Sequence, residues 1–182
     1  TVRAVLRSYV IEIDSLNRLN QNLTAENTRI KGQYNEATRQ IEGLNTERAT
    51  LSEKVAIAAQ LDATGISMQL KNKRGKNTDK TSKCTNIQVN FTIAKNVTAR
   101  NGQKTFYVRI TTPAGTTLGG GASFNYQNRS LEATMHKTVE YGGQEMAITT
   151  YWNVSQSLLA GTYQVSIFAD GNMIGSRSFT FK

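Results

Sequence analysis

Residues 16–30 read LNRLNQNLTAENTRI, with leucine or isoleucine at 16, 23 and 30 and asparagine at 20 and 27 between them. Alternate steps of three and four residues from Leu6 to Ala58 give 16 positions, of which 13 are apolar. Only 9 of the 40 other positions between Leu6 and Leu61 are apolar. An apolar repeat of 3.5 residues, held over about eight heptads, indicates a coiled coil.

The repeat also predicts the oligomeric state, because the two asparagines fall at a positions. An asparagine at heptad position a pairs with its equivalent across the seam of a two-stranded coiled coil, but it packs badly in the core of a three- or four-stranded one. We therefore expect a parallel homodimer. The alternative is one amphipathic helix that folds against its own domain. A helix of about 84 Å is, however, longer than a domain of about 100 residues covers. The predicted dimer seam consists of Leu6, Tyr9, Ile13, Leu16, Asn20, Leu23, Asn27, Ile30, Tyr34, Ile41, Leu44, Leu51 and Val55.

Beyond the coiled coil, the apolar period changes from 3.5 to 2. NIQVNFTIAKN, for example, alternates Ile87, Val89, Phe91 and Ile93 with polar residues. Strands are expected at 65–72, 86–96, 104–112, 122–126, 132–141, 146–154, 161–171 and 176–182. Short strands at regular spacing, with no helical segment between them, predict an antiparallel immunoglobulin-like β-sandwich of seven or eight strands. The fold class is therefore α + β in several parts, a long N-terminal coiled-coil helix followed by this sandwich.

Two aromatic residues support the sandwich. Tyr163 follows Gly161 at the start of the penultimate strand, where immunoglobulin-like domains place a corner tyrosine that bonds back to the preceding connection. Trp152 lies on a neighbouring strand, and we expect it to be a core anchor. Tight turns are predicted at Pro113–Gly115 and at Asp170–Gly171.

The balance of charge changes at the same place in the chain as the apolar period. Residues 1–62 carry eight basic and eight acidic side chains, whereas residues 63–182 carry 14 and five, the whole net charge of +9. The predicted organisation is a coiled coil at 1–62, a first strand with a basic linker loop at 63–85, and the sandwich at 86–182. The strand at 66–72 is a candidate further member of the sandwich.

The densest positive charge lies between residues 71 and 83, in KNKRGKNTDKTSK. Such a segment suits an anionic partner, whether lipid headgroups, anionic glycan or nucleic acid, through Lys71, Lys73, Arg74, Lys76 and Lys80. Aromatic residues that would stack on bases are absent from 71–83, which does not favour nucleic acid. The alternative is a mobile, solubilising loop. The glycine turn at residues 119–121 is a second candidate contact.

The sequence contains no group of residues whose types and spacing indicate a catalytic site. One histidine, His136, and one cysteine, Cys84, cannot build an ordinary His/Cys zinc site within one chain. His136 is expected to be exposed on its strand, and Cys84 either to be buried or to bridge to its equivalent in the dimer. We expect no enzyme, no cofactor and no metal. The sequence contains no run of 18 apolar residues, which is about the length needed to span a membrane, so we expect no transmembrane helix in it.

The succession of heptads, ISMQLKNKRGKNTDKTSK (66–83), NIQVNFTIAKN (86–96), GQKTFYVRITTPAGTTL (102–118) and the segment 149–182 resembles bacterial envelope proteins of Bacteroidetes type. The resemblance implies a membrane anchor before Thr1, a coiled coil and a C-terminal immunoglobulin-like domain held in the periplasm or at the surface.

Four functions remain open at this stage. The favoured one is a non-enzymatic envelope protein, a dimeric spacer that presents paired heads to a protein, a glycan or an anionic surface. The second is a cytoplasmic nucleic-acid or chromosome-associated coiled coil that uses the basic half. The others are a trimeric phage or pilus fibre component and an enzyme.

Overall fold

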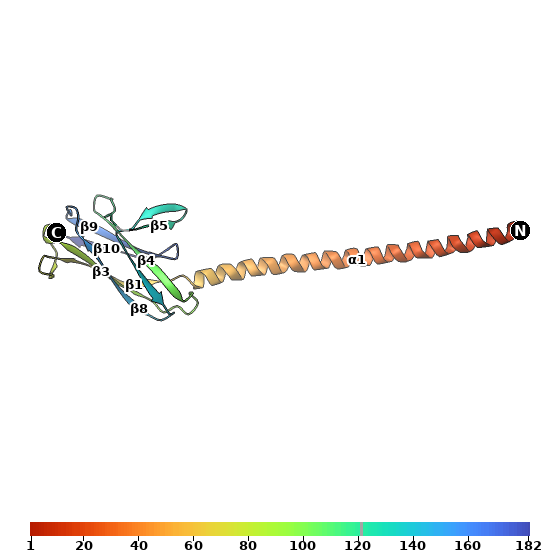
Figure 1. Ribbon diagram of the computed structural model, residues 1–182, viewed down its shortest axis with the longest axis horizontal. Helices are drawn as coiled ribbons and strands as arrows, with labels where there is room; N and C mark the ends of the chain where they lie inside the picture. Colours follow the sequence, from red (N-terminus) through yellow and green to blue (C-terminus); the bar gives the residue numbers. More distant parts are fainter. Residues whose placement is uncertain (121) are drawn as a thin grey trace. The chain divides into compact units, whose positions relative to one another are not determined.

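The computed structural model describes residues 1–120 and 122–182 and divides into two units, Thr1–Lys54 and Val55–Lys182. The first unit is helical, and the second contains all the strands (Figure 1). The predicted class is confirmed, since a long N-terminal helix is followed by an antiparallel β-sandwich.

The helix α1 runs without a break from Val2 to Ala58, and none of its side chains is buried. Its last turn belongs to the second unit, where Asn96 satisfies backbone carbonyls at the helix end. The Asn96 side-chain amide donates to the carbonyl oxygens of Ala58 and Gln60, each at 3.0 Å. The Ala58 carbonyl would otherwise lack a partner, because the last four carbonyls of any helix have none within it.

Eight strands form two sheets of four, and two more form a separate hairpin. The first sheet has the order β2 (Asn77–Thr78), β1 (Ala63–Lys71), β3 (Asn86–Ile93) and β8 (Met146–Asn153). The second has the order β10 (Asn172–Phe181), β9 (Gly161–Ala169), β4 (Gly102–Thr111) and β7 (Met135–Tyr141). The hairpin joins β5 (Ser123–Tyr126) to β6 (Arg129–Glu132).

The topology is that of an immunoglobulin-like sandwich with one strand exchanged between sheets. β3 pairs with β8, and β4 with β9, across long sequence separations. β7 joins β4 in the second sheet instead of extending the first sheet beyond β8. Sandwiches of this architecture tolerate such changes in topology.

The alternating residues build the core as predicted. Burial alternates along β3, and Ile87, Val89 and Ile93 are fully buried. Trp152 is 7% exposed, and its Nε1 donates to the Gly119 carbonyl oxygen at 3.0 Å, which confirms its structural role. Phe179 and Phe181 of β10 pack against this core from its margin.

One edge of the sandwich is closed where β1 meets β10. A Cβ on Gly175 would lie 2.8 Å from the Ala63 carbonyl oxygen, so only glycine allows this approach. Both strands carry a register shift there, between Thr64 and Ser67 and between Met173 and Gly175. Arg177 then donates to the Ile66 carbonyl oxygen at 3.0 Å and satisfies an edge group that no strand pairs.

All eight predicted strands are present, and the described residues contain two further short ones, β2 and β6. β6 forms because Gln127 and Asn128 both adopt positive φ, 48° and 60°, and so make a two-residue hairpin turn. β2 arises inside the segment predicted as a basic linker loop. That segment is not irregular throughout, since backbone hydrogen bonds fold it into a hairpin with β1 and a 3-10 helix, η1 (Thr81–Lys83).

The predicted turns and the corner tyrosine are confirmed. Asp170 and Gly171 adopt φ of 50° and 75° between β9 and β10, and Gly115 donates its N–H to the Thr112 carbonyl oxygen at 2.9 Å. The Tyr163 hydroxyl donates to the Leu159 carbonyl oxygen at 2.7 Å, in the connection that precedes β9. Tyr163 thus fastens that connection to the core.

Replacing Tyr163 by phenylalanine should lower the free energy of unfolding by about 1 kcal/mol, because it removes one hydrogen bond and leaves a carbonyl unpaired. Tyr151→Phe is the matched control, since Tyr151 is 62% exposed on β8. Denaturant unfolding of both variants measures the difference. Equal stability of the two variants would show that the corner bond contributes nothing.

Candidate functional site

The predicted seam residues all lie on α1 and are exposed in the single chain. The apolar side chains among them keep between 48% and 72% of their surface exposed, the extremes being Leu23 and Tyr34. Val10 and Ile11, which the heptad seam does not include, are also exposed, at 65% and 70%. The helix therefore carries a long apolar stripe that its own chain does not cover.

The basic segment is organised by the side chain of Asn72. Its Oδ1 accepts hydrogen bonds from the N–H groups of Arg74 at 2.9 Å and Lys76 at 3.1 Å. The Asn72 N–H donates to the Lys76 carbonyl oxygen at 2.9 Å, and Gly75 supplies the positive φ of 74° that this turn needs. The turn holds a fixed backbone beneath the cations that it carries.

The end of β10 is joined to the same region. The Lys182 N–H donates to the Asp79 carbonyl oxygen at 2.8 Å, and the Lys182 carbonyl accepts from the Thr81 N–H at 2.7 Å. We call this end of the sandwich, at which β1 finishes, the tip. Its basic residues are Lys71, Lys73, Arg74, Lys76, Lys80, Lys83 and Lys182, against the single carboxylate side chain of Asp79 in that segment.

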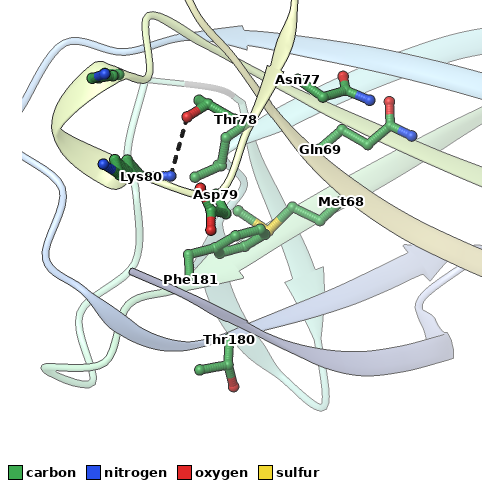
Figure 2. A pocket seen from close by; sticks show the side chains of 10 residues that line it. Met68, Gln69, Asn77, Thr78, Asp79, Lys80, Thr180 and Phe181 are labelled. Atoms are coloured by element: carbon green, nitrogen blue, oxygen red, sulfur yellow. Dashed lines mark hydrogen bonds between the residues drawn. The ribbon is translucent and has the colours of Figure 1, made fainter.

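A first cleft at the tip, the edge cleft, lies between β1, β2 and the end of β10 and measures about 570 Å³. Met68, Leu70 and Phe181 give it apolar lining. Asn77, Thr78, Asp79 and Lys80 line it on the side of the basic segment (Figure 2). Asp79 partly offsets the positive charge of this cleft.

A second cleft, the tip cleft, has a volume of about 470 Å³ and contains no carboxylate. Its lining consists of Asn72, Lys73, Arg74, Ser82, Lys83, Cys84 and Thr85. Lys83, the last residue of η1, lines both clefts. Of the predicted contact residues, Lys73 and Arg74 therefore meet in the tip cleft, Lys80 lines the edge cleft, and Lys71 and Lys76 line neither.

Cys84 lies in the lining of the tip cleft and is 8% exposed, which agrees with a buried thiol. Its Sγ donates to the Asn86 carbonyl oxygen at 3.3 Å. Burial raises the pKa of the Cys84 thiol, although backbone hydrogen bonds from Lys71 and Asn86 oppose the shift. The thiol is therefore neutral at neutral pH and a poor nucleophile.

His136 is exposed on β7, as expected, with its ring centroid 6.0 Å from that of Tyr107. Gly119 accepts the Trp152 hydrogen bond already described, whereas Gly121 lies outside the described residues. Among residues 1–120 and 122–182, no three His, Cys, Asp or Glu side chains gather as metal ligands do. Over the same residues, no helix has an apolar stretch long enough to span a bilayer.

Sequence reasoning missed a second apolar cluster, on the outer face of the second sheet. Phe124 of the β5–β6 hairpin stacks on Tyr107 of β4, with ring centroids 4.8 Å apart, and lies 4.8 Å from Phe168 of β9. The aromatic residues at 107, 124 and 168 were the available signal, because they fall on strand faces that the core does not use. The hairpin covers these rings, so they form packing and not a binding platform.

Sequence reasoning also missed an ion pair beside the turn between β9 and β10, in which Asp170 is half exposed. Lys104 Nζ lies 2.5 Å from Asp170 Oδ2, and the Lys104 side chain is only 9% exposed. Asp170 thus both adopts the turn conformation and neutralises a buried cation.

Two family models match this chain, over different parts of it. Residues 60–182 match the model of a domain of unknown function, DUF8428. The chain belongs to the DUF8428 family. Residues 1–49 match a further model, described as a coiled-coil region of unknown function, DUF8429. This second match supports the prediction of a coiled-coil region in the helix.

No curated protein matches the sequence. Among solved structures, the alkylpurine DNA glycosylase AlkC of Pseudomonas fluorescens, bound to DNA with an abasic-site analogue, is 13% identical with a TM-score of 0.39. That match covers 67% of this chain and 30% of AlkC. Two structures of a β-glucosidase from Kluyveromyces marxianus, one selenomethionine-labelled and one with glucose, show 13% and 14% identity and TM-scores of 0.38 and 0.40. They cover 65% and 68% of this chain but only 15% and 14% of the glucosidase, and likenesses at this level carry no argument about function.

The buried thiol makes the stability of the head depend on pH. Because its pKa is raised in the folded state, the unfolded chain releases this proton first, and stability should fall as pH rises above roughly 8.5. Cys84→Ala should therefore show a shallower loss of melting temperature between neutral pH and about pH 10. Tyr163, whose pKa is raised by burial and to a smaller extent by the charge of Cys84, is present in both proteins. Removing Cys84 also reduces the shift at Tyr163, so both changes make the variant's profile shallower. Parallel profiles for the two proteins would contradict the buried, neutral thiol.

Proposed function

We propose that this protein is a non-enzymatic structural and interaction protein of the bacterial cell envelope. In this proposal two chains form a parallel coiled coil, and the rod spaces a pair of immunoglobulin-like heads that bind a partner. The observation that carries the proposal is the exposed apolar stripe on α1, which has no buried residue along its 57 positions.

A second copy of the same helix is the partner that fits this stripe best. The apolar positions repeat with the period that brings two helices together, and the match to a coiled-coil region family covers residues 1–49. Asn20 and Asn27 lie within the stripe, where paired amides favour two strands in register over three or four.

The non-enzymatic role is supported by the state of the two side chains best suited to catalysis. Cys84 is buried and its pKa is raised, whereas His136 is exposed on β7 in the second sheet. A nucleophile and its base need to lie within hydrogen-bonding reach of each other.

Assignment to the envelope, with a membrane anchor before Thr1, is supported by the resemblance to Bacteroidetes-type envelope proteins.

Light scattering should give a mass near twice the 20.1 kDa of one chain. Replacing Asn20 and Asn27 together by isoleucine should shift the population towards trimers or tetramers, because the polar selection against them is lost. The control is Asn22→Ile with Asn35→Ile, which makes the same chemical change outside the seam and should leave the dimer intact. A wild-type trimer would overturn the asparagine argument, and a monomer would overturn the coiled-coil dimer.

Protease accessibility tests the location of the head. We expect cleavage of the sandwich in cells whose outer membrane is permeabilised but whose inner membrane is intact. Protection until the inner membrane is lysed would place the head in the cytoplasm. That result would reject the envelope proposal in favour of a nucleic-acid-associated coiled coil.

A further inference from the structure

The positive charge of the head is concentrated at the tip. Seven of the 14 basic residues in 63–182 lie there, yet only one of the five acidic residues does. The connections at 112–118 and 153–161 contain no charged residue. Ion pairing does not relieve the tip, because the ion pairs among the described residues are Arg18–Asp14, Arg29–Glu26 and Lys104–Asp170.

Within the tip, three cations converge on one cleft. Lys73 and Arg74 come from the turn after β1, and Lys83 comes from η1, nine residues beyond Arg74. All three side chains belong to exposed residues, and none forms an ion pair within the described chain. Like charges brought together at the surface repel one another, so an anion that enters the cleft is attracted by all three.

The backbone that carries these cations is held before any ligand arrives. Asn72 Oδ1 fixes the turn, the Thr85 N–H donates to the Lys71 carbonyl oxygen at 2.8 Å, and the Cys84 N–H donates to the Thr81 carbonyl oxygen at 3.2 Å. A binding surface whose backbone is already ordered loses less conformational entropy on binding than a mobile loop does. The structure therefore favours a binding role over the alternative of a mobile, solubilising loop.

The remaining lining residues indicate the chemistry of the ligand. Ser82 contributes a hydroxyl group, and Asn72 contributes the Nδ2 donor of its amide, since its Oδ1 is used within the turn. The Thr85 hydroxyl donates to the Lys71 carbonyl oxygen at 3.3 Å, and its oxygen can still accept a hydrogen bond, so neutral hydrogen-bonding groups lie among the cations. The cleft lining contains no aromatic side chain, and bases of single-stranded nucleic acid are held mainly by stacking on aromatic rings. It also contains no exposed apolar side chain to enter a lipid layer, because Cys84 is buried.

We infer that the tip cleft binds the acidic sugar residues of an anionic polysaccharide, with Lys73, Arg74 and Lys83 on the carboxylate and Asn72, Ser82 and Thr85 on sugar hydroxyls. A sugar acid offers a negative charge beside several hydroxyl groups, which is the combination that this lining can satisfy. The volume of about 470 Å³ lies in the range of small-ligand pockets. This inference names the partner of the heads and so rests on the proposed function.

The test is calorimetric titration of the full chain, at physiological ionic strength, with a homogeneous oligogalacturonate. The fully methyl-esterified form of the same oligosaccharide has the same backbone without the charge and is the matched ligand control. We expect the acid to bind and the ester to bind at least about tenfold more weakly, because the charge-assisted hydrogen bonds are lost.

The matched protein variants separate the cleft from overall charge. Lys73→Glu with Arg74→Glu should lower the affinity for the acid at least about tenfold, since two cations become repulsive carboxylates. Lys95→Glu with Arg129→Glu makes the same change in net charge at two exposed residues outside the tip, and we expect it to change the affinity by less than about threefold. Circular dichroism and melting temperature check that both variants are folded.

Several outcomes would overturn the inference. They are the absence of oligogalacturonate binding, equal binding of the ester, or equal losses in the two double variants. If a single-stranded oligonucleotide of matched charge binds as tightly as the acid, the cleft is reassigned to nucleic acid. If phosphatidylglycerol vesicles bind as tightly, it is reassigned to a membrane surface. Light scattering on the same samples keeps the proposals apart, because a dimer that does not bind contradicts only the ligand, and a monomer that binds contradicts only the dimer.

Discussion

The apolar stripe along α1 is the constraint on which the organisation of this protein depends. A helix of 57 residues with no buried side chain gains nothing from packing within its own chain, so the free energy that holds it must come from association or from its weak intrinsic helicity. The head has no such need. Its two sheets bury their own alternating faces, and corner, edge and turn contacts close them. The chain therefore combines a domain that is complete by itself with a helix that is not.

The head achieves its closure with a few local devices. The register shifts in β1 and β10, the absence of a Cβ at Gly175 and the bond from Arg177 to Ile66 all act at one edge. At the other, Lys137 of β7 donates to the Thr149 carbonyl oxygen of β8 at 3.2 Å. Each edge thus places a cationic side chain on strand carbonyls that have no strand partner, and such charges discourage pairing with other sheets.

Period and turn chemistry allowed most of the fold to be predicted. The alternation in 86–96, the turn residues Asp170–Gly171 and the position of Tyr163 each carry their signal within a few residues. The tip cleft could not be predicted in the same way, because Lys83 reaches Lys73 and Arg74 only through the Asn72 turn and η1. Strand β6 was missed for a related reason, since Gln127–Asn128 is a weak turn signal in the sequence and only the structure shows that both residues adopt positive φ. The loop lysines were visible in the sequence, but their convergence was not.

The course of β1 has a mechanical consequence. This strand begins at Ala63, directly after the helix connection, and ends at Lys71, next to the turn that carries Lys73 and Arg74. A pull between the helix α1 and a ligand held at the tip would run along one covalent strand of nine residues. Peptide bonds would carry that tension, while the hydrogen bonds from β1 to β3 would not have to break for it to be transmitted. Tension applied in this way would load the covalent chain of β1 and not the hydrogen bonds that hold the sandwich together, which is what the proposed role as a spacer requires.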